Sequence, residues 1–322
     1  MNFLIIGTNF ISDRFAEAAS EVPGVSLYAV YSRKLETGRD FAAKYGIDKV
    51  YTDYEEALSD AGIDAVYVAS PTLCHAEHTI LALRAGKHVL CEKMMGADLS
   101  DFEKMKSCAK ETGRILLEAM RPAHDPAYET VLEYLKRLGR LRRASFEFCQ
   151  YSSRYDAFLE GRMTNAFNPA MKNTALADIG IYPLHAALML LGEPKNVTAR
   201  SVFLENGFEG EGVMTLDYGD MLASVVYSKI TNSVTPSVIE GERGALTINK
   251  ISAPTELVYY PRGASAEVIK LDVAPNNMVY EIAAFRDMTL GKKDPQKYMN
   301  ITEYAQKIVE NVYISSGISD KF

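Results

Sequence analysis

The chain has 322 residues, 48% hydrophobic and 24% charged, with a formal net charge of −7. This length predicts two domains of ordinary size, and the composition is typical of a soluble globular protein. The acidic charge disfavours nucleic acid as a partner, and no apolar run reaches the roughly 18 residues of a membrane span. The N-terminus lacks the pattern of a signal peptide. The charge and the short apolar runs together mean that neither nucleic acid nor a membrane is expected as a partner.

The first 120 residues alternate strand and helix patterns. Apolar runs predict strands at 2–6, 25–31, 65–69, 88–91 and 115–119. Amphipathic patterns predict helices between them, at 13–21, 35–45, 74–85 and 99–112. This alternation indicates βαβ units and a parallel sheet covered on both faces. We therefore predict an N-terminal Rossmann dinucleotide-binding domain over 1–120.

After Pro122 the pattern changes. It predicts a strand at 144–151 and helices at 126–138, 177–191, 279–290 and 302–315. The polar and aromatic segment 152–173 has no clear period, and a connection of that length is usually a functional loop or lid. Turn signals break 196–271 into short strands, which favours antiparallel pairing. The prediction is an α/β protein whose second, α+β domain, 121–322, carries a large, mostly antiparallel open sheet.

The four cysteines show neither C-x-x-C nor zinc-finger spacing. They are interpreted as reduced thiols of a cytoplasmic protein. His75 and His78 have no third ligand at a suitable spacing, so no metal site is predicted.

A loop with one glycine follows the first predicted strand. A dinucleotide fingerprint places glycines at three positions of such a loop; this chain has Gly7, Asn9 and Ser12 there. Asn9 is expected to supply a left-handed backbone and Ser12 to permit close packing. The predicted phosphate-binding residues are Gly7, Thr8, Asn9, Phe10 and Ile11. By itself, the loop fits an ordinary strand-to-helix turn equally well.

The residues after the second predicted strand indicate which dinucleotide binds. An acidic residue there would hold the ribose 2′-hydroxyl of NAD. This chain has Ser32, Arg33 and Lys34 instead. A hydroxyl and two cations suit the 2′-phosphate of NADP, because arginine binds phosphate with two parallel hydrogen bonds. NADP is therefore predicted in preference to NAD, the alternative being a solvated turn with incidental basic residues.

Three further motifs are informative in combination. They are Ile63–Pro71, Ala85–Lys93 and Ala177–Pro183. With them the chain resembles the Gfo/Idh/MocA family of oxidoreductases over nearly its full length. The resemblance implies that Ser70, Pro71, His75, Glu92 and Lys93 lie at the cofactor. Met94 stands where the family usually has a proline, often after a cis bond, and 172–175 lacks the family's frequent glycines; both departures affect the expected shape of the substrate site.

The same resemblance assigns the chemistry. Tyr182 is expected to be the general acid/base, with Lys93 as its electrostatic partner and Asp178 as an orienting or substrate-binding group. The spacing of Asp178, Tyr182 and His185 predicts one face of a single helix, with His185 as the reserve acid/base. Arg121 follows the last strand of the parallel sheet and is expected to face the substrate. The alternative is that this helix has an ordinary polar stripe and that His185 is a packed histidine without a catalytic role.

The predicted function is hydride transfer between NADP, or NAD, and a carbohydrate-like sugar, polyol, diol or keto compound. Two alternatives stay open: sugar chemistry in which the cofactor is reduced and restored, and a regulatory protein that senses dinucleotide without turnover. The presence of both Lys93 and Tyr182 favours catalysis. The resemblance and the one-faced sheet also predict a homodimer or higher homo-oligomer, since a monomer would expose an apolar face.

Overall fold

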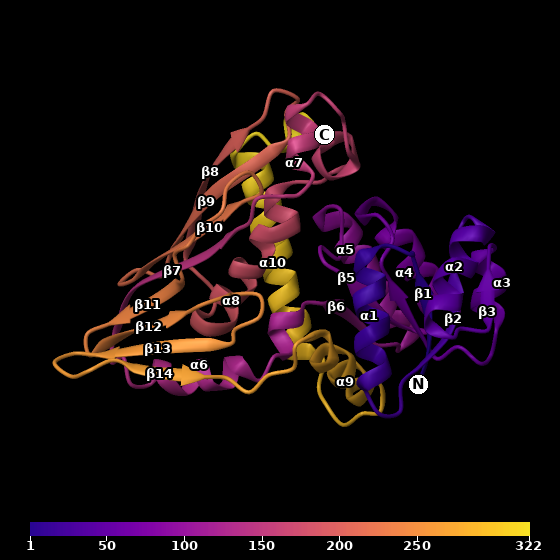
Figure 1. Ribbon diagram of the computed structural model, residues 1–322, viewed down its shortest axis with the longest axis horizontal. Helices are drawn as coiled ribbons and strands as arrows, with labels where there is room; N and C mark the ends of the chain where they lie inside the picture. Colours follow the sequence, from indigo (N-terminus) through magenta and orange to yellow (C-terminus); the bar gives the residue numbers. More distant parts are fainter. The chain divides into compact units, whose positions relative to one another are not determined.

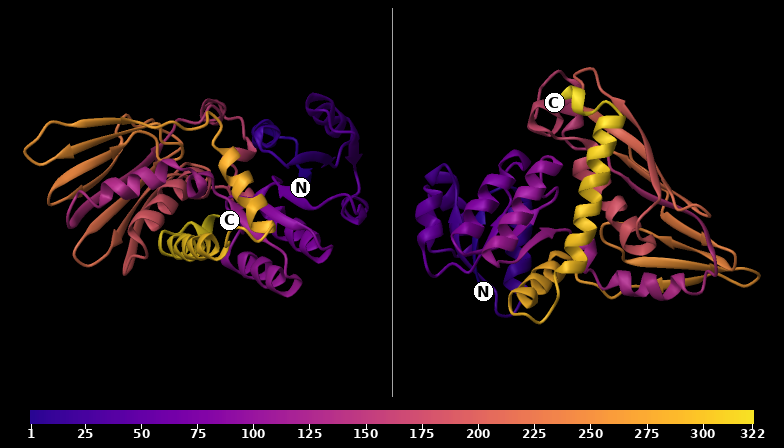
Figure 2. Two further views of the ribbon diagram at one scale, coloured as in Figure 1. Left: turned by 90° about the horizontal axis from the view of Figure 1, so that it is seen from below. Right: turned by 180° about the vertical axis from the view of Figure 1, so that it is seen from behind.

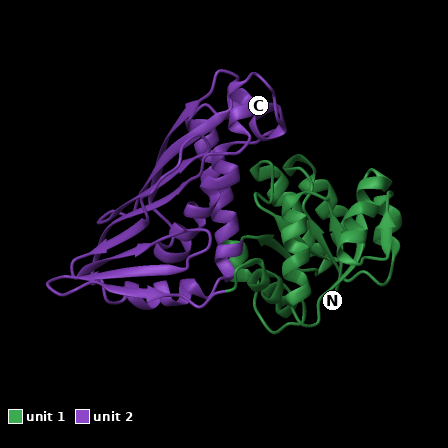
Figure 3. Ribbon diagram, viewed as in Figure 1, with its two compact units in different colours: residues 1–120, 274–300 green, residues 121–273, 301–322 purple.

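The computed structural model describes residues 1–322, which form two compact units (Figure 3). Unit 1 contains Met1–Met120 and Ala274–Asn300, and unit 2 contains Arg121–Val273 and Ile301–Phe322. Residues 274–300 therefore belong to the unit formed by the N-terminal part of the chain. Compact units are not the same as independently folding domains, so the division into 1–120 and 121–322 stays a prediction.

The sheet of unit 1 is parallel throughout and has the order β3-β2-β1-β4-β5-β6. Its strands are β1 (Asn2–Ile6), β2 (Ser26–Tyr31), β3 (Lys49–Tyr51), β4 (Ala65–Val68), β5 (His88–Glu92) and β6 (Leu116–Ala119). The chain moves outward from β1 to β3 and then returns to β4. This reversal between β1 and β4 is the position where such sheets bind ligands, at the carboxyl ends of the strands. The predicted Rossmann architecture is confirmed.

Helices cover both faces of this sheet (Figure 1). They are α1 (Phe10–Glu21), α2 (Leu35–Tyr45), α3 (Tyr54–Ser59), α4 (His75–Arg84), α5 (Leu99–Thr112) and α9 (Met278–Thr289). Side chains alternate along β1, so Phe3 and Ile5 join one core with α1 and α9, while Leu4 and Ile6 join another with α4 and α5. Full burial of each of these side chains stabilises the folded state by about 1.5–3 kcal/mol. The short β3 and α3 were not predicted.

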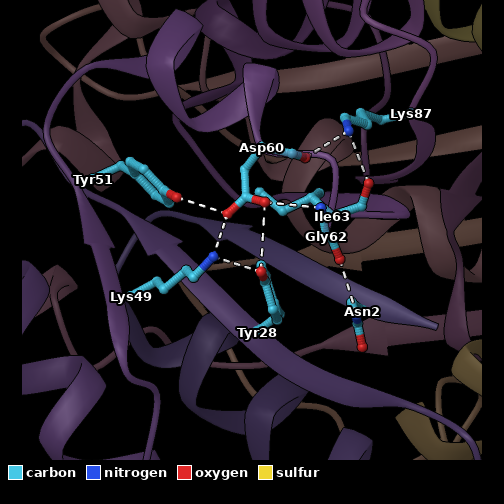
Figure 4. A network of polar contacts seen from close by, with 8 residues as sticks. All are labelled: Asn2, Tyr28, Lys49, Tyr51, Asp60, Gly62, Ile63 and Lys87. Carbon is cyan, nitrogen blue, oxygen red and sulfur yellow. Dashed lines mark hydrogen bonds and ion pairs between the residues drawn. The ribbon is translucent and has the colours of Figure 1, made fainter.

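The amino ends of the strands carry a polar network (Figure 4). Lys87, which immediately precedes β5, is buried, and its Nζ donates to the carbonyl oxygens of Asp60 and Ile63, both at 2.9 Å. The Asp60 carboxylate accepts hydrogen bonds from Lys49 at 2.6 Å and Tyr51 at 2.8 Å. The Lys49 ammonium therefore holds the pKa of Asp60 below its usual range. Lys87 is thus a structural residue, at the opposite end of β5 from Lys93.

Unit 2 contains an open sheet of eight strands in the order β14-β13-β12-β11-β7-β10-β9-β8. Its strands are β7 (Leu141–Cys149), β8 (Asn196–Phe203), β9 (Glu209–Asp217), β10 (Leu222–Ser228), β11 (Ser237–Gly241), β12 (Gly244–Ile248), β13 (Glu256–Pro261) and β14 (Glu267–Lys270). All neighbours pair antiparallel except β7 and β10. The predicted mostly antiparallel sheet is confirmed.

The helices of unit 2 lie on one face of this sheet (Figure 2). They are α6 (Ala127–Leu135), α7 (Tyr155–Leu159), α8 (Ile181–Leu191) and α10 (Gln296–Ser315), the last beginning in unit 1. Helix α8 packs against β7 and β10. Met214 and Val225 are buried on that face, whereas Val213 and Leu222 are exposed. No helix of the structure combines the length and apolar character that a membrane crossing requires.

Candidate active site

Unit 1 contains a groove of about 790 Å³ at the carboxyl ends of β1, β2 and β4. That volume is within the usual range for a small-molecule site, roughly 300–1,000 Å³. Of the predicted cofactor residues, Gly7, Thr8, Asn9, Ser32, Arg33, Ser70 and Pro71 line it, whereas Phe10, Ile11, His75, Glu92 and Lys93 do not. Lys34, the second cation predicted for the 2′-phosphate, also lines it, as do Thr37, Glu77 and His78, which were not predicted as site residues.

The loop between β1 and α1 requires a glycine and an asparagine for different reasons. Gly7 has φ +98°, and a Cβ there would lie 2.6 Å from the carbonyl oxygen of Ala69. Asn9 is extended, with φ −95° and ψ 179°, so the expected left-handed backbone is wrong. Asn9 is instead the N-cap of α1: its Oδ1 accepts from Ile11 N and Ser12 N, and its Nδ2 donates to the Ala69 carbonyl. The cap thus binds two of the helix N–H groups that an anion would otherwise use.

The rim of the groove that follows β2 is basic and rich in hydroxyl groups. The Ser32 Oγ and Thr37 Oγ1 atoms lie 2.8 Å apart, and Lys34 N donates to Ser32 Oγ at 3.4 Å. Lys34 is the N-cap of α2 but makes no side-chain cap. Arg33 and Lys34 supply two cations beside this hydroxyl pair. These groups fit a phosphate ester, since each hydroxyl can donate to one oxygen and the cations offset its charge.

His75 links β4 to the loop after β5. It is 1% exposed, with Nδ1 2.9 Å from the carbonyl oxygen of Met94 and Nε2 2.9 Å from that of Ser70. Burial lowers the pKa of His75, and the two carbonyl contacts oppose that effect. The neighbouring His78 contacts the Ser70 hydroxyl at 2.9 Å. His75 therefore positions backbone on both sides of the groove end rather than lining the groove.

The motif residue Glu92 ends β5, and Lys93 follows it directly. The Glu92 carboxylate accepts the Tyr67 hydroxyl at 2.5 Å and Lys93 N at 3.3 Å. The peptide bond between Lys93 and Met94 is cis, although Met94 replaces the proline usual at this position. Met94 and Met95 are buried, whereas Lys93 is partly exposed. Glu92 thus contacts protein groups, and Lys93 is the accessible group of the motif.

In unit 2, the single helix predicted over 177–191 is instead a π-helical turn, Leu176–Gly180, followed by α8. A π turn closes its hydrogen bonds one residue later than an α turn, which alters the direction of side chains on either side of it. Asp178 lies in the turn with its side chain 48% exposed, and it pairs with Lys229 at 2.8 Å. Tyr182 and His185 follow in α8 and are buried. The three residues therefore do not share one environment.

The hydroxyl of Tyr182 accepts a hydrogen bond from Arg121 Nη2 at 3.3 Å. The same guanidinium lies 5.3 Å from the centre of the tyrosine ring, and the Phe148 ring lies 5.7 Å from it. Arg121 was predicted as a substrate residue, and the structure brings it to Tyr182. Sequence spacing gave no signal for this pair, because 61 residues separate its members. Arg121 thus places a cation against both the hydroxyl and the ring of Tyr182.

A buried carboxyl group supports the π turn from the sheet. Glu209, the first residue of β9, is 1% exposed and accepts a hydrogen bond from Leu176 N at 3.0 Å. Burial raises the pKa of Glu209 to about 7, although the hydrogen bonds from Leu176 N and the Ser201 hydroxyl lower it. The ring of Tyr227 lies against Gly180, where a Cβ would come within 2.7 Å of it. Glu209 and Tyr227 therefore fix the turn that precedes Tyr182, and neither was predicted.

Comparison with known proteins identifies the class. Residues 1–120 match the oxidoreductase family with an NAD-binding Rossmann fold, and residues 134–247 match the GFO/IDH/MocA C-terminal domain. The groove and the parallel sheet are those of a dinucleotide-binding oxidoreductase. The chain belongs to the GFO/IDH/MocA family, which confirms the resemblance found in the sequence. It is therefore an NAD(P)-dependent dehydrogenase or reductase, the class of enzyme that interconverts a CH–OH group and a carbonyl.

Several relatives are similar over most of the chain. It is 40% identical to scyllo-inositol 2-dehydrogenase (NADP(+)) IolU of Bacillus subtilis, over 88% of this chain and 87% of that protein. It is 31% identical to the trans-1,2-dihydrobenzene-1,2-diol dehydrogenase of Mus musculus, over 79% and 76%. The crystal structure of KijD10, a 3-ketoreductase from Actinomadura kijaniata, superposes with a TM-score of 0.89 at 24% identity, covering 98% of both chains. That structure supports the fold.

Proposed function

We propose that the protein is an NADP-preferring dehydrogenase or reductase whose substrate is a polyol, a sugar or a related diol or keto compound. The observation that carries the cofactor choice is the rim formed by Ser32, Arg33, Lys34 and Thr37. It offers hydroxyl groups and cations for a 2′-phosphate. The named activity of the Bacillus relative, an NADP(+)-dependent dehydrogenase of an inositol, supports both the cofactor and the substrate class.

The groove fits a dinucleotide, and different residues of the groove would contact its pyrophosphate and its 2′-phosphate. Gly7 lets the loop approach the backbone of β4 closely, which leaves room for a pyrophosphate beside α1. Ser32, Arg33 and Thr37 would hold the 2′-phosphate. The nicotinamide, when bound, supplies the hydride-accepting or hydride-donating carbon. Ser70 and Pro71 line the groove where the chain leaves β4.

The protein's own chemistry is proton transfer at the substrate oxygen. We assign Tyr182 as the general acid/base, Lys93 as the cation that stabilises charge on the reacting oxygen, and Asp178 as a substrate-orienting group. The Arg121 guanidinium supports this assignment, because it places a cation within hydrogen-bond distance of the Tyr182 hydroxyl. His185 stays the reserve acid/base; the contact between Arg121 and the Tyr182 hydroxyl makes Tyr182 the better candidate.

A polyol screen tests this function. Purified protein is supplied with NADP(+) and a panel that includes scyllo-inositol, other polyols, aldoses and a cyclic trans-diol, and nicotinamide absorbance is followed. We expect NADP(+)-dependent turnover of at least one compound, and a fall in kcat of about 100-fold or more in Tyr182→Phe, the range for loss of a general acid/base. Tyr260→Phe, on an exposed position of β13, is the matched control. Tight nucleotide binding without turnover would instead support the sensor, and unchanged kcat in Tyr182→Phe would remove that residue from the chemistry.

We also propose a homodimer or higher homo-oligomer in the cytoplasm. The uncovered face of the eight-stranded sheet carries Val213 and Leu222, and its edge strands carry Val202 and Val268, all exposed. Burial of these apolar side chains against a second copy would stabilise a dimer. The four free cysteines are consistent with a reducing compartment. Sedimentation equilibrium tests the assembly, and a monomer at micromolar concentration would contradict it.

A further inference from the structure

Lys229, directly after β10, is a buried lysine whose backbone is held on two sides. The residue is 5% exposed. Its N–H donates to the Gly210 carbonyl at 2.9 Å, and its carbonyl accepts from Ser152 N at 2.9 Å. Lysine is seldom buried unless its ammonium group is paired. The backbone of Lys229 is therefore fixed beside Ser152, the first residue of the segment 152–173.

The side chain of Lys229 joins two separate parts of unit 2. Its Nζ lies 2.8 Å from Asp178 Oδ2, on the π turn, and donates to the carbonyl oxygen of Ala166 at 3.3 Å. An ammonium has three hydrogens, so it can donate to both groups at once. Lys229 thus connects the π turn to the middle of the segment 152–173.

Aromatic rings complete the surroundings of this ammonium. Its Nζ lies 5.1 Å from the centre of the Phe167 ring and 5.4 Å from that of Phe208, both within the range of a cation–π interaction. Phe167 is fully buried and also contacts Tyr155 and Phe158 of the same segment. Lys229 therefore contacts Ala166 directly and is linked to α7 through the Phe167 ring.

We propose that Lys229 is a positioning residue for the substrate, which sets the direction of the Asp178 carboxylate and holds the segment 152–173 to the same π turn. The role of Asp178 in this inference rests on the proposed function. The coupling between Asp178 and the segment does not, because it concerns contacts within unit 2 alone.

The coupling is tested by a double-mutant cycle of Lys229→Met and Asp178→Asn, read by hydrogen–deuterium exchange of the full-length protein. Methionine matches the length of lysine and packs against aromatic rings, so it removes the charge while keeping the volume. We expect Lys229→Met to speed amide exchange in peptides from 160–173 by about tenfold, a factor equivalent to roughly 1.4 kcal/mol. Asp178→Asn is expected to act in the same direction, and the double variant to be less than additive.

Two further variants provide the controls. Lys229→Arg keeps a cation and is expected to restore most of the exchange protection. Lys270→Met removes the lysine of the exposed Lys270–Glu256 pair between β14 and β13 and is expected to leave 160–173 unchanged. Exchange in 160–173 that is unaltered by Lys229→Met, or strictly additive effects in the cycle, would overturn the proposal.

Turnover gives a second readout if the polyol screen succeeds. Loss of a cation beside a carboxylate makes that carboxylate easier to protonate. The acidic limb of the kcat/KM–pH profile is therefore expected to move to higher pH in Lys229→Met and to stay in place in Lys229→Arg. A purely structural role would lower activity without moving the limb. If the wild-type protein turns over nothing, the proposed function fails, whereas the exchange cycle still decides whether Lys229 couples Asp178 to the segment.

Discussion

Replacing Glu209 by glutamine is predicted to change how the stability of the protein depends on pH. Glu209 is fully enclosed beneath the π turn and accepts a hydrogen bond from Leu176 N. Burial raises its pKa from the ordinary 4.5 to about 7. A glutamine has the same shape, and its carbonyl oxygen can accept the same backbone hydrogen bond, so the variant keeps the contact while losing the titration.

The sign follows from the proton count in the two states. Below pH 4.5 the carboxyl group is protonated in both the folded and the unfolded chain, and its favourable contribution is fully present. As the pH rises toward 7, the unfolded chain releases the proton while the folded protein retains it, so stability is lost. The interval from 4.5 to about 7 corresponds to a total loss of about 3 kcal/mol. Of this, about 2.5 kcal/mol falls between pH 5 and pH 8.

The assay is urea unfolding of the wild-type protein and Glu209→Gln at several pH values from 5 to 8. The free energy of unfolding of the variant, relative to wild type, should rise by about 2.5 kcal/mol across that range. Glu205→Gln, at an exposed position of the same unit, is the matched control for the amide substitution. Two stability curves that run parallel from pH 5 to pH 8 for wild type and Glu209→Gln would refute the reasoning.

Other substitutions test the two ends of the parallel sheet. Gly7→Ala places a Cβ 2.6 Å from the Ala69 carbonyl oxygen at φ +98°. It should therefore weaken NADPH binding by about tenfold or more and destabilise unit 1 by about 1–3 kcal/mol. Fluorescence titration measures the affinity and urea unfolding the stability; wild-type affinity in the variant would show that the loop has room for a Cβ. Lys87→Met leaves the buried carbonyl of Ile63 and the partly buried carbonyl of Asp60 without their donor, which should cost about 2–4 kcal/mol of stability. An unchanged urea midpoint in Lys87→Met would contradict that structural role.

Local patterns in the sequence predicted the regular elements well. The helices α2 and α5 and the strand β1 begin and end where periodicity and turn residues placed them. The strand β3 has three residues and the helix α3 six, which is too short for either to show a period. The strand predicted at 88–91 extends to Glu92, and Lys93 follows it directly. The structural role of Lys87 in the same motif depends on Asp60 and Ile63, which are distant in sequence.

The parts of the site that the sequence missed depend on contacts between distant residues. Arg121 reaches Tyr182, Lys229 reaches both Asp178 and Ala166, and no spacing rule relates these residues. Asn9 lines the groove, but its expected left-handed backbone was wrong. An asparagine at the start of a helix serves either as a cap or as a left-handed residue, and only the backbone angles decide. The π turn was not predicted either, since one extra residue in a turn leaves the apolar pattern of the sequence almost unchanged.

The most direct test of the account is the affinity of the purified protein for NADPH and NADH, followed by nicotinamide fluorescence in the wild type and in Arg33→Ser. The account predicts saturable binding of NADPH at least about tenfold tighter than that of NADH, with the preference reduced in Arg33→Ser because NADPH binding alone weakens. Equal or tighter binding of NADH by the wild type would contradict the assignment of the rim to the 2′-phosphate. Binding of neither nucleotide would contradict the proposed enzyme itself.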